Sequence, residues 1–320
     1  MQAYVFQNIN ELPFKTEINI PEIQDNEEIV EIKASALNHR DLWITKGQYP
    51  NLRFGTVLGS DGCVTLGGNT FIINPGLNWG TTEKYQSDRF KILGMPDFGT
   101  FAEYLHIDRT YLYTKPTHLS NEEAAALPLA GVTAYRALVV KTQPEKGEKV
   151  LISGVGGGVA LFAMQFALAL GCEVYVTSGS EHKIEKAKEL GAKAGYLYQN
   201  PDWTKQLISD IGGVDVVIDG ACGPTFNNLV KICNPGARIS FYGGTQGKID
   251  GLNPQLIFWR QISVFGSTMG SDLDFVNMLS LVEKYRIKPV IDCVLPFDHV
   301  HDGFRKMKEG TQFGKIVFSH

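Results

Sequence analysis

The chain has 320 residues, of which 43% are hydrophobic, and its formal net charge is −4. This length favours two domains over one, and the small negative charge excludes a general attraction to nucleic acids or anionic membranes. No apolar run approaches the roughly 20 residues that cross a bilayer. Because residues 1–9 lack the basic and apolar regions of a signal peptide, we expect a cytoplasmic protein that binds neither membrane nor nucleic acid.

The cysteines carry no metal or redox signature. The chain has five of them, and no two form a C-x-x-C pair. Sparse cysteines of this kind suit a reducing compartment, and we expect them to be small buried side chains. They are Cys63, Cys172, Cys222, Cys233 and Cys293.

The first part of the chain is rich in short strands. Alternating or apolar segments predict strands at 29–34, 56–64, 71–75 and 99–107. The polar segment 76–97 predicts a long surface excursion. Together these features indicate a mainly β domain of the barrel type.

From Ser120 onward, strands and helices alternate. The segment 120–123 predicts a capped helix start, and 131–139 predicts a second helix. Six apolar strands then alternate with helices, which indicates a doubly wound parallel sheet because parallel neighbours need crossovers of helix length. The strands are expected at 150–153, 173–177, 194–198, 214–219, 237–242 and 262–265, and the helices at 158–171, 181–190, 202–211, 224–233 and 253–259.

The last segment is too short to fold alone. It predicts a helix at 274–285, a strand at 287–295, a helix at 297–308 and a strand at 315–318. We therefore expect it to complete the first domain, so that the α/β domain is an insertion. The predicted domains are 1–119 with 270–320, and 120–269.

A glycine-rich turn follows the first strand of the α/β series. Residues 154–160 read Gly-Val-Gly-Gly-Gly-Val-Ala, with Gly154, Gly157 and Ala160 three apart. This is no literal G-x-G-x-x-G, and an ordinary tight turn is the alternative. Its place at the first strand–helix junction of six favours a dinucleotide site, in which backbone groups approach a pyrophosphate. The contacting residues are predicted to be Gly154, Gly156, Gly157, Gly158 and Val159.

The end of the second strand of this series indicates the cofactor. An NAD enzyme is expected to carry an acid there for the ribose hydroxyls. The chain instead has Ser178 and Ser180, with Lys183 close behind, which favours a 2′-phosphate and hence NADP(H). Glu181 is the counter-evidence, and we interpret it as an acid in the first turn of a helix.

The sequence predicts no metal site. Catalytic zinc takes three protein ligands such as two Cys and one His. His39 and Cys63 have no further Cys or His spaced to complete such a set, and residues 76–97 contain no Cys for a structural site.

These motifs together resemble one family. The chain is similar to the medium-chain dehydrogenase/reductase superfamily, in its zinc-independent quinone oxidoreductase branch, which implies a GroES-like catalytic domain around a Rossmann domain. The zinc-dependent relatives have a Cys where Asn38 stands and Gly-His-Glu where Gly59-Ser60-Asp61 stands. The matching segments are 36–41, 58–62, 99–104, 127–135, the glycine turn, 188–192 and 314–317.

The resemblance implies further site residues and a partner. Asn38 would lie beside the nicotinamide with Thr133 nearby, and Tyr198 would flank the adenosine phosphate with Ser178 and Lys183. The family also implies a homodimer that pairs through strand 262–267, and an exposed apolar edge strand is a template for such pairing. We also assign Gly220, Tyr242, Gly243 and Lys315 to the cofactor site.

The implied reaction is hydride transfer from NADPH to a small-molecule electron acceptor, either a quinone or an activated enone or alkenal. Without a metal, hydrogen-bond donors must polarise the acceptor, and the candidate catalytic residues are Asn38, His39, Arg40 and Tyr49. Asp41 is more simply interpreted as a structural carboxylate. Phe54 and Trp79 are candidates to line the acceptor pocket or to fill core. One alternative is an NADPH-binding sensor with weak or no turnover, and another is a small alcohol or aldehyde dehydrogenase.

Overall fold

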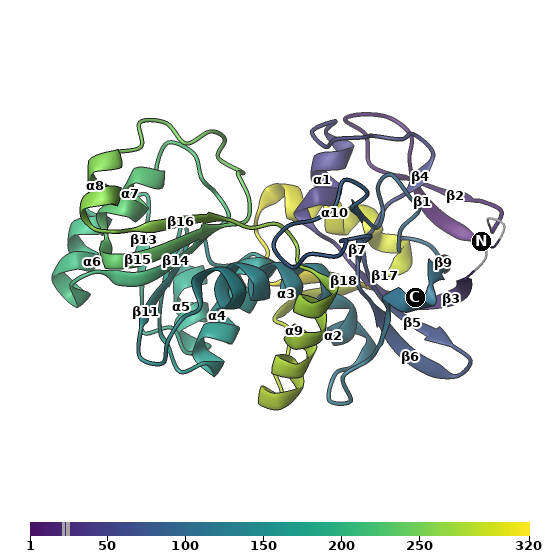
Figure 1. The fold of residues 1–320 in the computed structure, drawn as a ribbon. Coiled ribbons are helices and arrows are strands. Elements are labelled where there is room, and N and C mark those ends of the chain that lie inside the picture. Colours follow the sequence, from purple (N-terminus) through teal and green to yellow (C-terminus); the bar gives the residue numbers. More distant parts are fainter. Residues whose placement is uncertain (21–22, 24–25) are drawn as a thin grey trace. The chain divides into compact units, whose positions relative to one another are not determined.

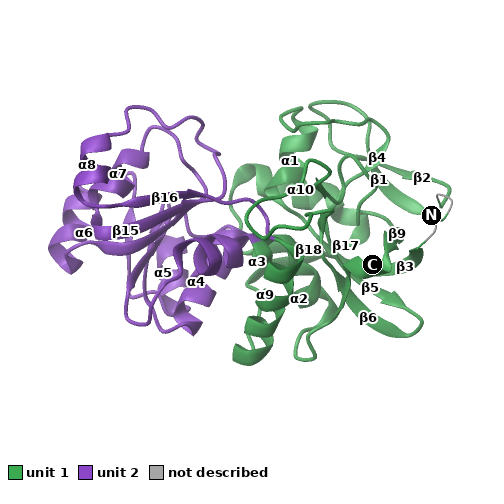
Figure 2. Ribbon diagram, in the orientation of Figure 1, with its two compact units in different colours: residues 1–132, 271–320 green, residues 133–270 purple. Residues whose placement is uncertain are grey.

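The computed structural model describes residues 1–20, 23 and 26–320. The chain divides into two compact units: unit 1 comprises Met1–Val132 and Ser271–His320, and unit 2 comprises Thr133–Gly270 (Figure 2). Residues 120–132, which we assigned to the inserted domain, belong to unit 1. The reason is that helix α2 (Asn121–Ala126) packs on the strands of the unit 1 sheet. No helix in the described part of the chain is long and apolar enough to span a membrane.

Unit 2 is built on one six-stranded sheet (Figure 1). All its strand pairs are parallel, and the spatial order is β13-β12-β11-β14-β15-β16. This is the order of a doubly wound dinucleotide-binding fold, so the fold predicted for this part of the chain is confirmed. The strands are β11 (Lys149–Ile152), β12 (Glu173–Ser178), β13 (Ala194–Leu197), β14 (Val214–Asp219), β15 (Cys233–Phe241) and β16 (Ser263–Gly266).

Helices connect these strands. Helix α4 (Gly158–Ala169) packs on β11, β12 and β14 and is buried over most of its surface, as its small and apolar residues predict. The predicted helix 224–233 is two elements instead, because Cys233 already pairs with Val214 as the start of β15. The remaining helices are α5 (Glu181–Glu189), α6 (Trp203–Ile211), α7 (Phe226–Lys231) and α8 (Pro254–Trp259).

Unit 1 is mainly β, as predicted. Its larger sheet has the order β10-β6-β5-β3-β18-β17, with β9 also paired to β3. The smaller sheets are β2-β1-β4 and the pair β7-β8, which lies inside the predicted excursion. The strands are β1 (Gln2–Phe6), β2 (Phe14–Glu17), β3 (Glu27–Ala36), β4 (Thr56–Val57), β5 (Asp61–Leu66), β6 (Asn69–Ile73), β7 (Gly76–Leu77), β8 (Lys91–Ile92), β9 (Tyr104–Asp108), β10 (Leu112–Thr114), β17 (Ile291–Pro296) and β18 (Lys315–Ser319).

The predicted strand 56–64 is divided by Gly59. This residue adopts φ of +96°, and a Cβ there would lie 2.6 Å from both Phe101 and Thr100 side chains. Only glycine therefore fits, and the chain turns from β4 into β5 at this point. The sharp turn places Ser60 and Asp61 in the interior, where both are fully buried.

The helical elements of unit 1 cover its sheets. The two apolar side chains Phe101 and Phe318 meet edge to face in the core beside α10 (Val300–Glu309), which is the arrangement aromatic pairs prefer. Helix α3 (Pro128–Tyr135) begins in unit 1 and is continued in unit 2 by the π-helical segment η2 (Arg136–Thr142). The other elements are α1 (His39–Thr45), η1 (Arg109–Tyr111), α3 (Pro128–Tyr135), α9 (Asp272–Tyr285), η3 (Phe297–His299) and α10 (Val300–Glu309).

The five cysteines are free thiols, and all except Cys293 are buried. Burial raises the pKa of Cys63 and Cys233 to about 12, which keeps these thiols protonated and unreactive. The expectation that they are buried small side chains is confirmed for these four.

Candidate active site

The glycine turn of unit 2 lies between β11 and α4, at the carboxyl edge of the parallel sheet. Gly154 and Gly156 have φ values of +62° and +128°, which other residues rarely adopt. Gly157 is the N-cap of α4 and provides no side-chain cap. The first N–H groups of this helix are therefore not capped by a side chain, and they present donors and a positive dipole end of the kind that binds phosphate.

The turn is held in place by its neighbours. The backbone N–H groups of Gly154 and Val155 donate to the Oγ1 and O atoms of Thr177, at 3.1 and 2.8 Å. Ser153 donates through its N–H to Ile218 O at 3.0 Å and through its hydroxyl to Asp219. The ends of β12 and β14 thus fix the shape of the turn before any ligand binds.

The predicted 2′-phosphate residues converge at the ends of β12 and β13. A Cβ at Gly156 would lie 2.9 Å from Lys183 Cδ, and a Cβ at Gly179 would lie 2.6 Å from the Tyr198 hydroxyl. The buried Ser178 hydroxyl accepts from the N–H of Ser180 at 3.2 Å. The structure therefore brings Ser178, Ser180, Lys183 and Tyr198 to the same edge as the glycine turn.

A second group of predicted cofactor residues lies at the ends of β14 and β15. A Cβ at Gly220 would be 2.7 Å from the Tyr242 hydroxyl, and one at Gly243 would be 2.8 Å from Gly220 O. Burial, followed by the nearby Asp219, raises the pKa of Tyr242 well above its ordinary value, so this phenol stays protonated. Thr133 is buried in unit 2, where its hydroxyl contacts Met269 Sδ at 3.7 Å.

Unit 1 contains a separate cluster of buried charges at the start of α1. The Arg40 guanidinium donates to the Tyr49 hydroxyl at 3.2 Å, to Ser60 Oγ at 2.5 Å and to Leu93 O at 2.8 Å. Its Cζ also lies 4.7 Å from the centre of the Tyr49 ring. Arg40 is thus held in one orientation, and it orients the half-buried Tyr49.

The second cation of this cluster is Lys315, at the start of β18. Its ammonium donates to Leu37 O at 3.0 Å, to Asn38 Oδ1 at 2.7 Å and to Asp61 Oδ2 at 2.8 Å. The Asn38 amide donates in turn to Asp61 Oδ2 at 2.9 Å. All three ammonium donors are thus used inside unit 1, and Lys315 fixes the orientation of the Asn38 amide.

Asp41 is fully buried beside this network. Its Oδ2 accepts from the backbone N–H of Asn38 at 2.9 Å, while Oδ1 has no hydrogen-bond partner among the described residues. Burial raises the pKa of Asp41 to about 6, and the nearby Arg40 opposes that rise. The interpretation of Asp41 as a structural carboxylate fits its place in the first turn of α1.

Three other predicted residues lie outside the cluster. His39 is exposed at the first position of α1. Trp79 is buried, with its indole N–H donating to Thr82 O at 2.9 Å, so it fills core. Phe54 is 58% exposed and stacks on Phe6.

The unit 1 donor set does not suit zinc. The side chains at the positions in question are an amide, a hydroxyl and one carboxylate, from Asn38, Ser60 and Asp61, whereas zinc prefers thiolate and imidazole. A lysine ammonium already lies between Asn38 and Asp61. Within residues 1–20, 23 and 26–320, no group of three or more His, Cys, Asp or Glu could hold a metal ion.

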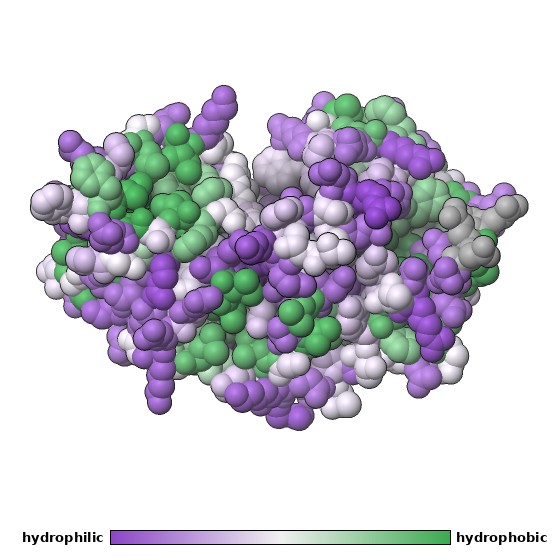
Figure 3. Space-filling view, in the orientation of Figure 1, coloured by the Kyte–Doolittle hydropathy of each residue, from purple (hydrophilic) through white to green (hydrophobic). Residues whose placement is uncertain are grey.

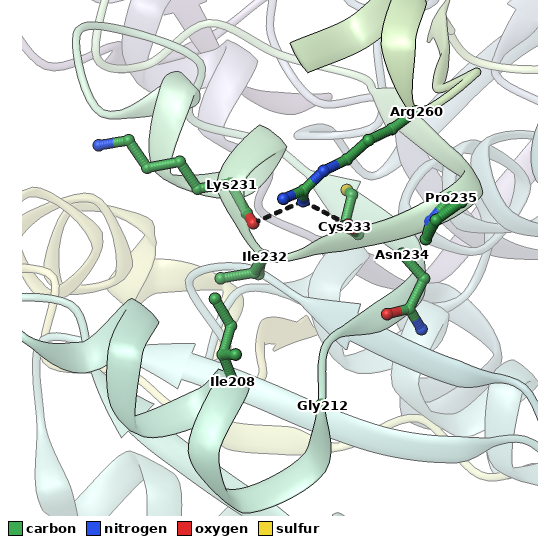
Figure 4. Close-up of a pocket in the computed structure, with 8 residues that line it drawn as sticks. All are labelled: Ile208, Gly212, Lys231, Ile232, Cys233, Asn234, Pro235 and Arg260. Atoms are coloured by element: carbon green, nitrogen blue, oxygen red, sulfur yellow. Dashed lines mark hydrogen bonds between the residues drawn. The ribbon is translucent and has the colours of Figure 1, made fainter.

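A small cavity in unit 2 lies at the opposite edge of the sheet from the glycine turn. It has a volume of about 240 Å³ and opens at the amino end of β15, beside Cys233 and Arg260 (Figure 4). Arg260 donates to the backbone oxygens of Lys231 and Cys233 at 3.1 and 2.9 Å. Ligands of such sheets bind at the carboxyl ends of strands, so this cavity is not the dinucleotide site.

Sequence reasoning missed the partners that organise both sites. No role is predicted for Ser60, Asp61 and Asp219, although each is a polar residue at one end of a buried strand, which is the available signal. Ser153 is a further polar residue of this kind, because it directly follows β11 and opens the glycine turn.

Comparison with known proteins identifies both parts of the chain. Residues 24–117 match the family model described as alcohol dehydrogenase GroES-like domain, and residues 158–284 match the one described as zinc-binding dehydrogenase. The GroES-like fold predicted for the first domain is therefore confirmed.

Similar proteins match along nearly the whole chain. The zinc-type alcohol dehydrogenase-like protein YogA of Leptosphaeria maculans is 34% identical, over 91% of this chain and 90% of that protein. A crystal structure of an NAD-dependent alcohol dehydrogenase is 36% identical with a TM-score of 0.93 and full coverage of both chains. The quinone oxidoreductase of Thermus thermophilus has a TM-score of 0.80 over both full chains, and its 23% identity supports a shared fold alone.

Proposed function

Because the chain belongs to the medium-chain dehydrogenase/reductase superfamily, with zinc-type alcohol dehydrogenases among its similar relatives, we propose that it is a metal-independent, NADPH-dependent reductase of a quinone or an activated enone or alkenal. These matches confirm the predicted superfamily. Membership makes the protein an oxidoreductase, and a nicotinamide cofactor is typical of this superfamily. The branch, the preference for NADPH and the acceptor are the proposed parts.

One observation carries the metal-independent part of the proposal. The Lys315 ammonium lies within hydrogen-bond distance of both Asn38 and Asp61, which are the positions that the zinc-dependent relatives are expected to use for metal ligands. Neither side chain provides a thiolate or an imidazole. Polarisation of the acceptor must then come from hydrogen-bond donors.

Tyr49 and Arg40 are suited to that task. Arg40 Nε donates to the Tyr49 oxygen, which leaves the Tyr49 O–H to donate elsewhere. The nearby guanidinium stabilises negative charge that develops on the phenolic oxygen as its proton moves toward the acceptor. When bound, the nicotinamide supplies the hydride, and the protein positions the acceptor and excludes water.

The cofactor part of the proposal is supported by unit 2. The end of β12 carries no acid, and Lys183 and Tyr198 lie beside the two glycines Gly156 and Gly179. A lysine with neutral hydroxyls suits a 2′-phosphate, whereas an acid would suit the free ribose hydroxyl of NAD.

The test is a scan of NADPH and NADH oxidation with quinones, enones and aldehydes, before and after exhaustive treatment with a chelator. We expect turnover with NADPH and at least one quinone or enone, unchanged by the chelator. Tight NADPH binding with no turnover would favour the sensor alternative and contradict the proposal. Activity that is lost with chelated metal and restored by stoichiometric zinc would contradict its metal-independent part.

The second candidate is a small alcohol or aldehyde dehydrogenase. It is favoured by the names of the similar proteins, since the 34% identical relative is described as a zinc-type alcohol dehydrogenase-like protein and the 36% identical structure as an NAD-dependent alcohol dehydrogenase. On these names alone, it ranks above quinone reduction. Oxidation of primary alcohols with NAD⁺ or NADP⁺ in the same assay series distinguishes the two candidates.

We also propose a homodimer that pairs through β16. This strand is the edge of the unit 2 sheet, and Val264 on it is exposed. The preceding helix α8 exposes Phe258 and Trp259, the latter by 84%. Apolar side chains gather over this end of unit 2 (Figure 3), as expected of a surface that a second copy covers.

A further inference from the structure

The Lys315 ammonium has as many acceptors as it has donors. Its three N–H groups meet a backbone carbonyl, an amide oxygen and a carboxylate oxygen, from Leu37, Asn38 and Asp61, at 3.0, 2.7 and 2.8 Å. Lys315 is 4% exposed and Asp61 is 0% exposed. A cation held by three oxygens away from water is the arrangement of a bound ion rather than of a surface ion pair.

The backbone delivers this ammonium to a fixed place. Gly314 has φ of +121°, and a Cβ there would lie 2.4 Å from Val290 O, so the chain can pass only without a side chain at this position. One residue after Lys315, Ile316 O accepts from the N–H of Leu37 at 2.9 Å. The start of β18 and the end of β3 are thereby aligned, and the lysine side chain reaches the oxygens that follow β3.

The side-chain oxygens of Asp61 and Ser60 also have hydrogen-bond partners. Asp61 Oδ1 accepts from the backbone N–H of Leu129 at 2.8 Å, while its Oδ2 accepts from Asn38 and Lys315. Ser60 Oγ accepts from Arg40 and donates to Leu93 O at 2.8 Å. Asn38, Ser60 and Asp61, which occupy the positions in question, are therefore each already held by a cation.

We infer that Lys315 is the built-in cation of the unit 1 site: it neutralises Asp61, fixes the amide of Asn38 and excludes a divalent metal ion from these oxygens. This inference rests on the proposed metal-independent function for its significance. A divalent ion at these oxygens would lie within about 4 Å of the ammonium, where like charges repel strongly even at an effective dielectric constant of about 20. Without the ammonium, carbonyl, amide and carboxylate oxygens are ligands that hard cations such as Mn²⁺ accept.

The experiment compares metal binding by the wild type with that by Lys315→Ala, with neither cofactor nor acceptor present. Mn²⁺ is the probe, because loss of its free-ion electron paramagnetic resonance signal reports binding directly. We expect Lys315→Ala to bind one Mn²⁺ per chain at least roughly 100-fold more tightly than the wild type. The midpoint temperature of its thermal unfolding should also rise when Mn²⁺ is added.

Two control variants locate the effect. Lys315→Ala/Asp61→Asn removes both charges and is expected to lose the acquired Mn²⁺ binding. Lys288→Ala makes the same charge change at an exposed pair with Glu123, 3.0 Å long, and is expected to bind Mn²⁺ no better than the wild type. Equal Mn²⁺ affinity in the wild type and a folded Lys315→Ala would overturn the inference.

A Lys315→Ala variant that does not fold is also informative. It leaves Asp61 buried without its cation, which is strongly destabilising. The inference then requires that refolding with Mn²⁺ restores cooperative unfolding, while the double variant folds without metal. Failure of Mn²⁺ to restore folding would contradict it. None of these measurements depends on turnover, so they test the role of Lys315 even if the protein lacks the proposed reductase activity.

Discussion

Asp41 carries a titration that should be visible in the stability of the protein. Its pKa is raised from 3.8 to about 6 by burial, so the folded state binds this proton more tightly than the unfolded state does. The protonated Asp41 carboxyl therefore contributes to the free energy of unfolding in full below about pH 4, and this contribution is lost as the pH rises through 6. The difference of roughly two pKa units corresponds to about 3 kcal/mol.

Replacement of Asp41 by Asn removes the titration and keeps an oxygen for the Asn38 N–H. We expect the unfolding free energy of Asp41→Asn, relative to the wild type, to increase by up to about 3 kcal/mol between pH 4 and pH 7. Urea unfolding across this range measures the difference. The groups facing Asp41 are Arg40, Asp61 and Lys315, and a difference that does not vary with pH would show that they keep Asp41 ionised throughout.

Lys183 should decide the choice between cofactors. Lys183→Ala removes a charged donor from the predicted 2′-phosphate site, so we expect KM for NADPH to rise by roughly tenfold or more and KM for NADH to change little. Lys188→Ala is the matched control on the same helix, because Lys188 pairs with Glu185 at 3.0 Å. Equal effects of the two lysine variants would contradict the assignment.

Ser178→Asp places an acid at the end of β12 and should shift the cofactor preference toward NADH.

At the scale of elements, the glycine turn offers a paired test. A Cβ at Gly156, with φ of +128°, would meet Lys183 Cδ at 2.9 Å, whereas one at Gly157 would meet nothing within 4 Å. Gly156→Ala should cost roughly 1–3 kcal/mol of unfolding free energy, and Gly157→Ala should cost much less. Urea unfolding of both variants measures this. Similar losses would show that the turn relaxes around a side chain.

The edge strand β16 provides the test of the proposed dimer. Val264→Lys places a charge on the edge strand and should convert the dimer to a monomer, as measured by light scattering after size-exclusion chromatography. Leu190→Lys is the control, because Leu190 is an exposed apolar residue of unit 2 at the end of α5. A monomeric wild type, or a Val264→Lys variant that stays dimeric, would count against pairing through β16.

At the scale of the whole molecule, the sequence predicted the α/β unit well and the unit 1 site only in part. The six strands of unit 2 are apolar runs separated by helix-length segments, so local pattern sufficed. The cluster around Asn38 is different. Lys315 and Asp61 are 254 residues apart, and only the pairing of β3 with both β5 and β18 brings them together. No local pattern reports such pairing, so the sequence alone does not place Lys315 beside Asp61.

The place of β18 in the unit 1 sheet has a consequence for synthesis of the protein on the ribosome. β18 pairs with β3 on one side and with β17 on the other, so this sheet gains its inner strand only when residues 315–319 have emerged. Unit 2 is one continuous segment and can fold earlier. Until residues 315–319 have emerged, β3 lacks its partner strand β18, and Asp61 lacks the ammonium of Lys315. A nascent chain arrested before residue 315 should therefore show protease resistance in unit 2 and sensitivity in unit 1.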